Sequence, residues 1–289
     1  MISLLVPVFN EEESAAQTIE RAHRALSSQS EDFEIIVIND GSTDKTASIL
    51  ESFRDEKIRV ISRTQNTGYG SSIKTGIRKS KGNLIATVDA DGTYPIEDFP
   101  KLIAKIKESG ADMAVGSRTK PGVKFEFKRR IGKFIIGILA NKAAGMKIPD
   151  NNSGMRIFTR ELAESFMHLY PQKFSLTLTL TLAALTNGYE VVFVPIDYFK
   201  RTGKSTLSFR HFWSFFAILL RVTTYFNPLK FFIWPSGILL LSGIAMIAYT
   251  VSAEKNVSDT GLLLFLTGLQ IGLFGVLAEA VVRNRQKTA

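Results

Sequence analysis

The chain has 289 residues, and its 36 Lys and Arg residues outnumber its 27 Asp and Glu residues, which gives a formal net charge of +9. It contains no cysteine, which excludes disulfide bonds and thiolate metal sites. A basic balance is typical of proteins that bind nucleic acid, an anionic membrane surface or phosphate-bearing substrates. The apolar C-terminal third favours the last two. No recognised nucleic-acid motif is present, so we expect no nucleic-acid partner.

Short β-branched runs alternate with helical patterns across residues 1–205. The predicted strands cover residues 2–9, 33–39, 58–62, 83–89 and 111–117. The predicted helices cover residues 11–28, 43–55, 68–82 and 96–109. This alternation predicts an α/β fold, a mostly parallel sheet with helices on both faces. Met1 leads directly into the first strand without a basic flank or a cleavage-site pattern. We therefore expect no secretory signal and a cytosolic N-terminal domain.

The sharpest local pattern is DADG at residues 89–92, directly after an apolar strand. Ligands bind at the carboxyl ends of the strands in such sheets. Asp89 and Asp91 stand one residue apart there, and both can reach one cation. Mg²⁺ and Mn²⁺ prefer oxygen ligands and commonly link carboxylates to substrate phosphates. Two such acids in isolation are more typical of a solvated loop, but their place after a buried strand favours a metal site.

Two further motifs follow the first and second strands. PVFNEE at 7–12 and DGSTD at 40–44 each place acids at a strand–helix junction. Asp40 stands at the strand end, where it could accept a hydrogen bond from a nucleobase. Helix capping is the alternative role for the acids and hydroxyls of both motifs.

Two apolar runs near the C-terminus predict a transmembrane hairpin. Residues 231–251 carry no charge, and residues 261–282 carry only Glu279. A run of roughly 20 apolar residues is long enough to cross a bilayer. Basic residues flank the outer ends of the two runs, so the positive-inside rule places the N-terminal domain and the tail in the cytoplasm. A buried core hairpin of a soluble protein is the alternative.

We expect three parts: a catalytic domain at 1–205, an interfacial helix at 206–228, and the membrane hairpin with its basic tail at 229–289. The stretch 209–226 is rich in aromatic residues but interrupted by charges, which suits the headgroup layer. The stretch 128–144 could be a second surface helix or an ordinary amphipathic core helix. Small residues in the hairpin could pack within it or against a second copy, which makes a homo-oligomer conceivable: Gly237, Gly243, Gly268, Gly272 and Gly275.

The ordered motifs PVFNEE, NDGSTD, DADG and GSR resemble those of family-2 inverting glycosyltransferases with the GT-A fold. NNSGMR at 151–156, RTGKST at 201–206 and the hairpin narrow this resemblance to the polyprenyl-phosphate glycosyltransferases, such as dolichyl-phosphate mannose synthases and their bacterial relatives. The resemblance covers essentially the whole chain. It implies transfer of a sugar from a UDP- or GDP-sugar to dolichyl or undecaprenyl phosphate. It also implies a Mg²⁺ or Mn²⁺ cofactor and an integral membrane protein.

The resemblance implies a role for each matching residue. Nucleotide-sugar binding is expected at Pro7, Phe9, Glu11, Asp40, Asp89, Ala90, Asp91, Arg201 and Lys204. Asp89 and Asp91 are the expected metal ligands. Contacts with the acceptor phosphate are expected at Arg118, Ser153 and Arg156, with Arg129 or Arg130 and Lys133 as further candidates. The expected catalytic set is Asp89, Asp91, Arg118, Arg201 and Lys204.

Three positions depart from the family pattern. Asn39 replaces the first acid before the Gly-Ser pair, and Met155 replaces the usual Phe. Thr93 stands where many relatives have a metal-binding Gln; because its hydroxyl is a poorer ligand, we expect water to complete the metal shell. The two main carboxylates are retained, and the departures leave the donor preference open.

The acceptor class affects the expected mechanism. A phosphate monoester has a second pKa near 6 and is largely a dianion at neutral pH, so it needs no general base. The segment 173–185, where a base could stand, contains no acid. Two rival functions remain at this point. One is a family-2 transferase that extends a glycan or another lipid-linked acceptor, although neither a further acidic base nor a Q-x-x-R-W motif is found. The other is an inactive scaffold or lipid-binding membrane protein, which would not need the acids and basic residues above.

Overall fold

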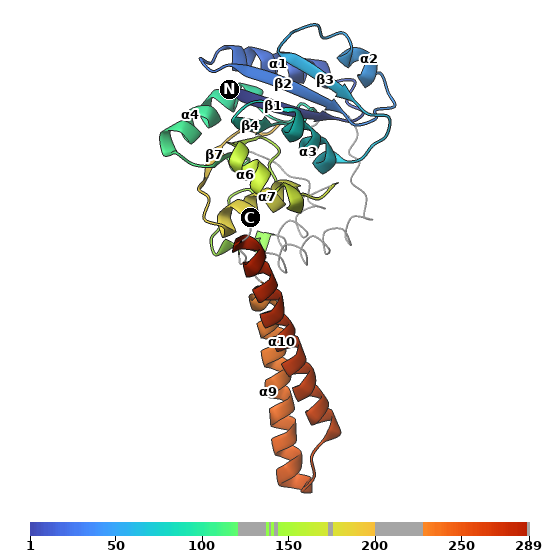
Figure 1. Cartoon of the computed structure of the whole chain (residues 1–289), viewed down its shortest axis with the longest axis vertical. Coiled ribbons are helices and arrows are strands. Elements are labelled where there is room, and N and C mark those ends of the chain that lie inside the picture. The colour runs from blue at the N-terminus through green and yellow to red at the C-terminus, as the bar shows by residue number, and fades with distance from the viewer. Residues whose placement is uncertain (121–136, 139, 142–143, 173–175, 200–227, 288–289) are drawn as a thin grey trace. The chain divides into compact units, whose positions relative to one another are not determined.

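The structure is a computed structural model of the whole chain, shown in Figure 1. It describes residues 1–120, 137–138, 140–141, 144–172, 176–199 and 228–287. The chain divides into two compact units, Met1–Phe209 and Arg210–Ala289, which are described separately. The predicted domain boundary near residue 205, the interfacial helix at 206–228 and most of the stretch 128–144 lie outside the described residues.

The first unit is built on a seven-stranded sheet with the order β3-β2-β1-β4-β6-β5-β7. Its strands are β1 Ile2–Val8, β2 Phe33–Asn39, β3 Ile58–Ser62, β4 Leu84–Thr87, β5 Met113–Ser117, β6 Arg156–Thr159 and β7 Val191–Pro195. The first four are parallel, and β5 runs parallel to β7. β6 is antiparallel to both of its neighbours. The predicted mostly parallel sheet is confirmed, and β6 and β7 are additions to the five strands expected from the sequence.

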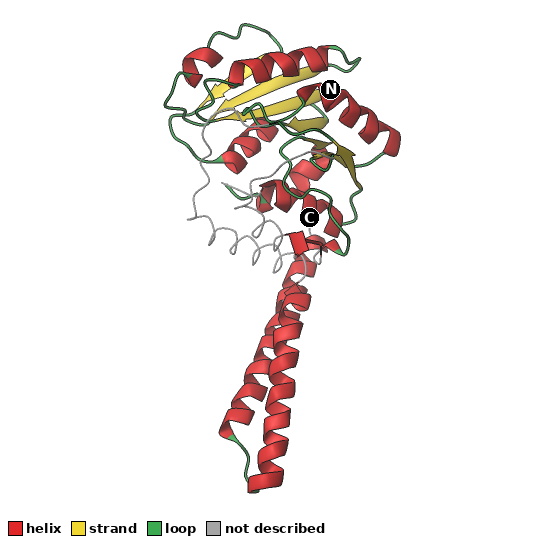
Figure 2. Cartoon of the chain, turned by 180° about the vertical axis from the view of Figure 1, so that it is seen from behind, coloured by secondary structure: helices red, strands yellow, loops and turns green. Residues whose placement is uncertain are grey.

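Helices cover both faces of this sheet, as Figure 2 shows. The apolar sides of α1 Ala15–Ser27, α2 Thr46–Leu50 and α4 Phe99–Ser109 share one hydrophobic core with the sheet. α3 Tyr69–Lys79, α6 Arg160–Ser165 and α7 Leu176–Thr186 share the core on the other face. Two short 3₁₀ turns, Ile96–Asp98 and Met167–Leu169, precede α4 and follow α6. The helices predicted at 11–28, 68–82 and 96–109 are present, and the one at 43–55 is shorter than expected.

The strand register brings the sequence motifs to one edge. Val8 pairs with Asn39, and Leu5 pairs with Thr87, so β1, β2 and β4 end side by side. The antiparallel β6 begins where β4 ends, because Arg156 pairs with Thr87. The segment before β6 therefore meets the DADG loop, although more than sixty residues separate them in the chain. Chain reversal at β6 is what adds this segment to the site.

The second unit is a helical hairpin of α9 Pro228–Glu254 and α10 Asp259–Lys287. Both helices are long and apolar enough to cross a membrane, with a mean hydropathy of 2.0 in each span. Only 11% and 17% of the two apolar windows are buried, whereas the core hairpin of a soluble protein is mostly buried. The predicted spans at 231–251 and 261–282 are confirmed as helices, and the exposed apolar surface argues against the core-hairpin alternative.

Small residues bring the two hairpin helices into close contact. A Cβ added at Gly268 would lie 2.8 Å from the Leu240 nitrogen, and one at Gly243 would lie 2.6 Å from the Phe265 nitrogen. The Ser236 hydroxyl donates a 2.8 Å hydrogen bond to the Gly268 carbonyl. Such small-residue packing is typical of membrane helices. A Cβ added at Gly237, in contrast, would meet nothing within 4 Å in the described part of the chain. The glycines at 243, 268, 272 and 275 thus serve the hairpin itself, and a homo-oligomer stays a prediction.

Candidate active site

The DADG loop follows β4 at the edge where the parallel strands end. Asp91 Oδ1 accepts a 2.6 Å hydrogen bond from the Thr93 hydroxyl and a 3.2 Å bond from the Thr93 backbone N–H. Thr93 is 1% exposed, so its side chain points into the protein. Thr93 therefore orients the Asp91 carboxylate. The sequence analysis considered the Thr93 hydroxyl only as a metal ligand and missed this role.

Gly154 fixes the position of the second carboxylate. A Cβ added at Gly154 would lie 2.5 Å from Asp89 Oδ2 and 2.7 Å from its Cγ. The Gly154 N–H donates to the Tyr94 hydroxyl at 2.7 Å, and the Gly154 carbonyl accepts from the Thr87 hydroxyl at 2.7 Å. Both backbone groups of this glycine are thus held, and its Cα lies directly against the Asp89 carboxylate.

The two carboxylates fit a divalent cation whose shell is completed by phosphates and water. Among residues 1–120 and the other described ranges, no group of three or more His, Cys, Asp or Glu side chains is gathered as a complete protein cage. Mg²⁺ usually uses one or two carboxylates together with substrate phosphates rather than such a cage. The donor set of Asp89 and Asp91 therefore matches a metal that arrives with a diphosphate.

Tyr69, the first residue of α3, lies beside Asp89. Burial, and then the negative charge of Asp89, raise the pKa of the Tyr69 hydroxyl well above its usual value. A side-chain hydrogen bond to Asp89 is a further cause, so the buried Tyr69 hydroxyl is directed at this carboxylate. Tyr69 therefore helps to hold Asp89 at the site.

Arg118, at the end of β5, forms a buried ion pair with Asp150. Arg118 Nε and Nη2 donate to the two Asp150 oxygens at 2.7 and 2.8 Å, and the side chains are 8% and 9% exposed. Burial alone would raise the pKa of Asp150, but the hydrogen bonds and charge of Arg118 lower it below its usual value. Burial would likewise lower the pKa of Arg118, and the bond to Asp150 raises it instead. Both groups are thus charged at neutral pH.

Arg156 lies beneath the site rather than on its surface. It is 0% exposed, its Nη1 donates to the Thr177 carbonyl at 3.0 Å, and its Nε donates to the Ser153 carbonyl at 3.1 Å. Burial lowers the pKa of Arg156 from its usual value. Ser153 is also 0% exposed, and its buried hydroxyl has no partner among the residues described. The expected contact of both residues with an acceptor phosphate stays a prediction; in the structure Arg156 ties α7 to the turn that carries Gly154.

Asp40, at the end of β2, organises the loop before α3. It accepts from the Gly68 N–H at 2.7 Å, from the Thr67 hydroxyl at 2.8 Å and from Arg63 Nη1 at 3.0 Å. Burial would raise the pKa of Asp40, but the hydrogen bonds from Thr67, Gly68 and Arg63 outweigh it and lower the pKa. Asp40 is 3% exposed, and its oxygens already accept these hydrogen bonds. Its expected contact with a nucleobase stays a prediction.

Residues 3–166, more than half of the chain, match glycosyl transferase family 2. The chain belongs to this family. Residues 227–283 match the GtrB C-terminal hairpin, which coincides with α9 and α10. The resemblance to family-2 glycosyltransferases that the motifs predicted is thereby confirmed, and the protein is a glycosyltransferase.

The chain is similar to several named glycosyltransferases along nearly its whole length. It is 28% identical to the undecaprenyl-phosphate 4-deoxy-4-formamido-L-arabinose transferase of Proteus mirabilis, over 98% of this chain and 88% of that protein. It is 31% identical to the low-salt glycan biosynthesis hexosyltransferase Agl6 of Haloferax volcanii, over 95% of this chain and 67% of that protein. It is 29% identical to the bactoprenol glucosyl transferase of Shigella phage SfX, over 98% and 94% of the two chains.

Solved structures support the predicted GT-A fold. Glucosyl-3-phosphoglycerate synthase from Mycobacterium tuberculosis, in complex with Mn²⁺, UDP and glucosyl-3-phosphoglycerate, superposes with a TM-score of 0.59 at 18% identity. That match covers 78% of this chain and 79% of the other. TarS from S. aureus in complex with UDP-GlcNAc gives a TM-score of 0.55 at 18% identity, over 77% and 66% of the two chains. At this identity the likeness concerns the fold.

The remaining predicted residues of this family-2 enzyme divide into two groups. Pro7 lies within β1, and Phe9 and Glu11 follow that strand. The Glu11 N–H donates to the Thr46 hydroxyl at 3.0 Å. Ala90 is 2% exposed, and its carbonyl accepts from the Thr18 hydroxyl at 3.3 Å. The predicted residues that lie outside the described part are Arg129, Lys133, Arg201 and Lys204.

Sequence reasoning missed several residues that shape this site. They are Tyr69, Thr87, Tyr94, Asp150, Gly154 and Tyr198. For Gly154 a signal existed, because it belongs to the NNSGMR motif; for Asp150 the signal was its place just before that motif. The tyrosines carried none, because only the fold brings them to the carboxylates.

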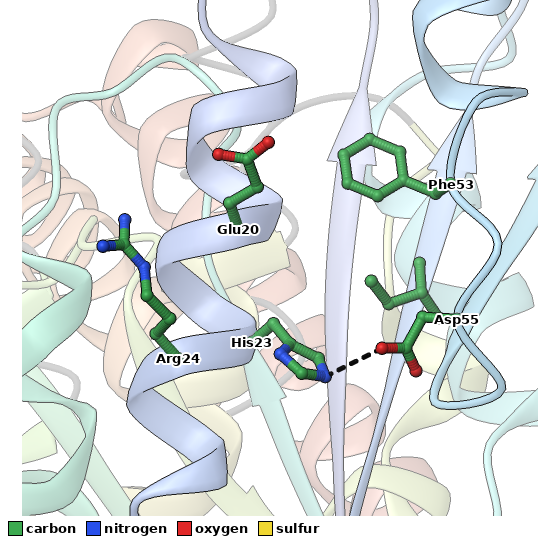
Figure 3. Close-up of a pocket in the computed structure, with 6 residues that line it drawn as sticks. Glu20, His23, Arg24, Phe53 and Asp55 are labelled. Atoms are coloured by element: carbon green, nitrogen blue, oxygen red, sulfur yellow. Dashed lines mark ion pairs between the residues drawn. The ribbon is translucent and has the colours of Figure 1, made fainter.

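A separate hollow lies away from this site. A cavity of about 360 Å³ lies between the last turns of α1 and the start of β3, and Figure 3 shows its lining. His23 Nε2 and Asp55 Oδ2 form a 3.1 Å pair across it. This hollow is at the amino ends of the strands, so it is separate from the glycosyltransferase site at their carboxyl ends.

Proposed function

We propose that this chain transfers a sugar from a UDP- or GDP-sugar to a polyprenyl phosphate, with the catalytic unit on the cytoplasmic side of a membrane. The observation that carries the proposal is that one chain holds the fixed Asp89 and Asp91 carboxylates together with a helical hairpin long and apolar enough to cross a membrane. Relatives that act on undecaprenyl phosphate and bactoprenol support it.

The orientation rests on the charges that flank the hairpin. Lys230 lies at the start of α9, and the basic residues of the tail follow the second span: Arg283, Arg285 and Lys287. The loop between the helices holds Lys255 among acids. The positive-inside rule then assigns both outer ends to the cytoplasm.

The reaction that suits these residues is an in-line displacement. An oxygen of the lipid phosphate attacks the anomeric carbon of the sugar. The bond from that carbon to the nucleoside diphosphate breaks, and the diphosphate leaves with the electron pair. A divalent ion held by Asp89 and Asp91 would neutralise charge on the departing diphosphate. Arg118 would bind and orient the acceptor phosphate, and Arg201 and Lys204 would stabilise the leaving group.

No general base is required, because the attacking phosphate is already ionised at neutral pH. Asp150 is the acid next to Arg118, and its carboxylate oxygens are already occupied by hydrogen bonds. Its Oδ2 accepts from the Arg118 backbone N–H and from Nε, and its Oδ1 accepts from Nη2 and from the Asn152 N–H. Its lowered pKa makes it a weak base. These observations support a phosphate acceptor over a sugar hydroxyl.

The test is transfer of label from a panel of UDP- and GDP-sugars to polyprenyl phosphate by the purified protein, with and without Mg²⁺ or Mn²⁺. Asp91→Asn should abolish the lipid product while membrane insertion is retained. Asp32→Asn is a matched control, since Asp32 is 70% exposed and precedes β2 at the opposite edge of the sheet. Wild-type turnover by Asp91→Asn would refute the metal role. Transfer to a soluble glycan instead would favour a glycan-extending enzyme, and a lack of nucleotide binding would favour a scaffold.

A further inference from the structure

The segment after β7 is fastened on both of its sides to site elements. The Ile196 N–H donates to the Ser117 carbonyl at 2.8 Å, next to Arg118. The Phe199 N–H donates to the Thr93 carbonyl at 2.9 Å, two residues after Asp91. This segment therefore joins the DADG loop to the end of β5.

Tyr198 lies between the two hydrogen-bonded residues, Ile196 and Phe199. Its ring packs edge-on against Tyr94, with 5.4 Å between the ring centroids. The Arg118 guanidinium carbon lies 5.1 Å from the Tyr198 ring centroid, within the range of a cation–π contact. Phe199, the next residue, points outward and is 48% exposed. Alternation along an extended segment thus sends Tyr198 to the site and its neighbour to the surface.

We propose that Tyr198 is a positioning residue for the reaction, acting through Arg118. Asp150 holds the guanidinium in its plane by two hydrogen bonds, and the Tyr198 ring supports its face. Together they remove the rotations by which a long Arg side chain would lose its aim, so the phosphate meets a preorganised cation. This inference rests on the proposed role of Arg118 in binding the acceptor phosphate.

The experiment compares Tyr198→Leu, Tyr198→Phe and the neighbouring control Phe199→Leu in the full-length protein. Tyr198→Leu removes the ring and should raise the KM for polyprenyl phosphate by roughly tenfold, between the effects of an exposed and a desolvated cation–π contact. Tyr198→Phe keeps the ring and should stay within about twofold of wild type, since a Phe face also attracts cations. Metal-dependent binding of UDP or GDP should be the same in all variants, which shows that the donor site remains folded.

A double-mutant cycle with Arg118→Lys identifies the route of the effect. If Tyr198 acts through the guanidinium, Tyr198→Leu should change the KM by less than about twofold when the Arg118→Lys substitution is also present, because the planar face is already lost. Equal KM values for Tyr198→Leu and Phe199→Leu would overturn the inference, as would an undiminished effect of Tyr198→Leu in the Arg118→Lys background. A wild-type protein that forms no lipid-linked sugar would overturn the proposed function. Equal KM values in proteins that do form this product would overturn the role of Tyr198 alone.

Discussion

Substitution of Gly154 by Ala tests the geometry of the metal site directly. The added Cβ would lie 2.5 Å from Asp89 Oδ2, about 0.9 Å inside ordinary van der Waals contact, which begins near 3.4 Å. The turn cannot retreat cheaply, because its N–H is held by Tyr94 and its carbonyl by Thr87. Losing these two bonds would cost about 1–3 kcal/mol of folding free energy. The Asp89 carboxylate is the more mobile partner, and we expect it to be displaced by about 1 Å.

A displacement of this size at a catalytic group costs about 100-fold in rate. We therefore expect Gly154→Ala to lower the transfer rate by about two orders of magnitude and to weaken Mn²⁺-dependent nucleotide binding, measured by radiolabel transfer and by calorimetry. Gly137→Ala is the control in the same unit, since a Cβ there meets nothing within 4 Å among the residues that the structure describes. Unchanged nucleotide binding and rate in Gly154→Ala would refute the reasoning.

Three further outcomes follow from individual contacts. Thr93→Val removes the 2.6 Å hydrogen bond to Asp91 and should raise the Mn²⁺ concentration for half-maximal activity by about tenfold, as read from a metal titration. Asp150→Asn leaves Arg118 charged and buried, and should lower the free energy of unfolding by about 3–5 kcal/mol at pH 7 in detergent. Because the folded pKa of Asp150 is lowered, the loss should be constant above the unfolded carboxyl pKa of about 3.9 and should shrink as pH falls through the folded pKa. Gly268→Leu should separate α9 from α10 and lower the thermal midpoint of the solubilised protein, because a Cβ already comes within 2.8 Å of backbone.

Each of these outcomes has a control. Thr93→Ser keeps a hydroxyl and should retain the metal response; a change equal to that of Thr93→Val would argue against the hydrogen bond. A stability loss for Asp150→Asn that persists unchanged well below pH 4 would contradict the ion-pair account. Gly237→Leu adds the same bulk to α9 where nothing lies within 4 Å, so it should leave the midpoint unchanged.

The run of alternating Leu and Thr at the start of α7 shows where sequence pattern and structure part. Strict alternation over residues 176–182 has the period of a strand, yet the segment is helical. Both residue types are buried there, so the alternation marks no exposed face. The helix also satisfies the hydroxyls locally, since Thr181 donates to the Thr177 carbonyl four residues earlier at 2.9 Å. The spacing of apolar residues indicates helix or strand only where one face of the element is exposed to water.

Several features could be predicted from the chain because each depends on local or composition-level physics. The membrane hairpin follows from two long uncharged runs, and the first five strands follow from β-branched runs bounded by polar turns. Asp89 and Asp91 could be singled out because ligands gather after parallel strands. The family resemblance was carried by an ordered set of short motifs, which survives where overall identity is low.

Tertiary structure alone decided how those motifs meet. The antiparallel β6 brings Gly154 against Asp89, and the segment after β7 brings Tyr198 onto Arg118. Neither contact has a signature in sequence spacing, because strand direction and order are set by the packing of the whole sheet. The same packing buries Arg156 completely, and its expected contact with an acceptor phosphate stays a prediction. A sequence names the groups that can do the chemistry, and the long-range contacts of the fold determine which of them face the substrate and which hold the others in place.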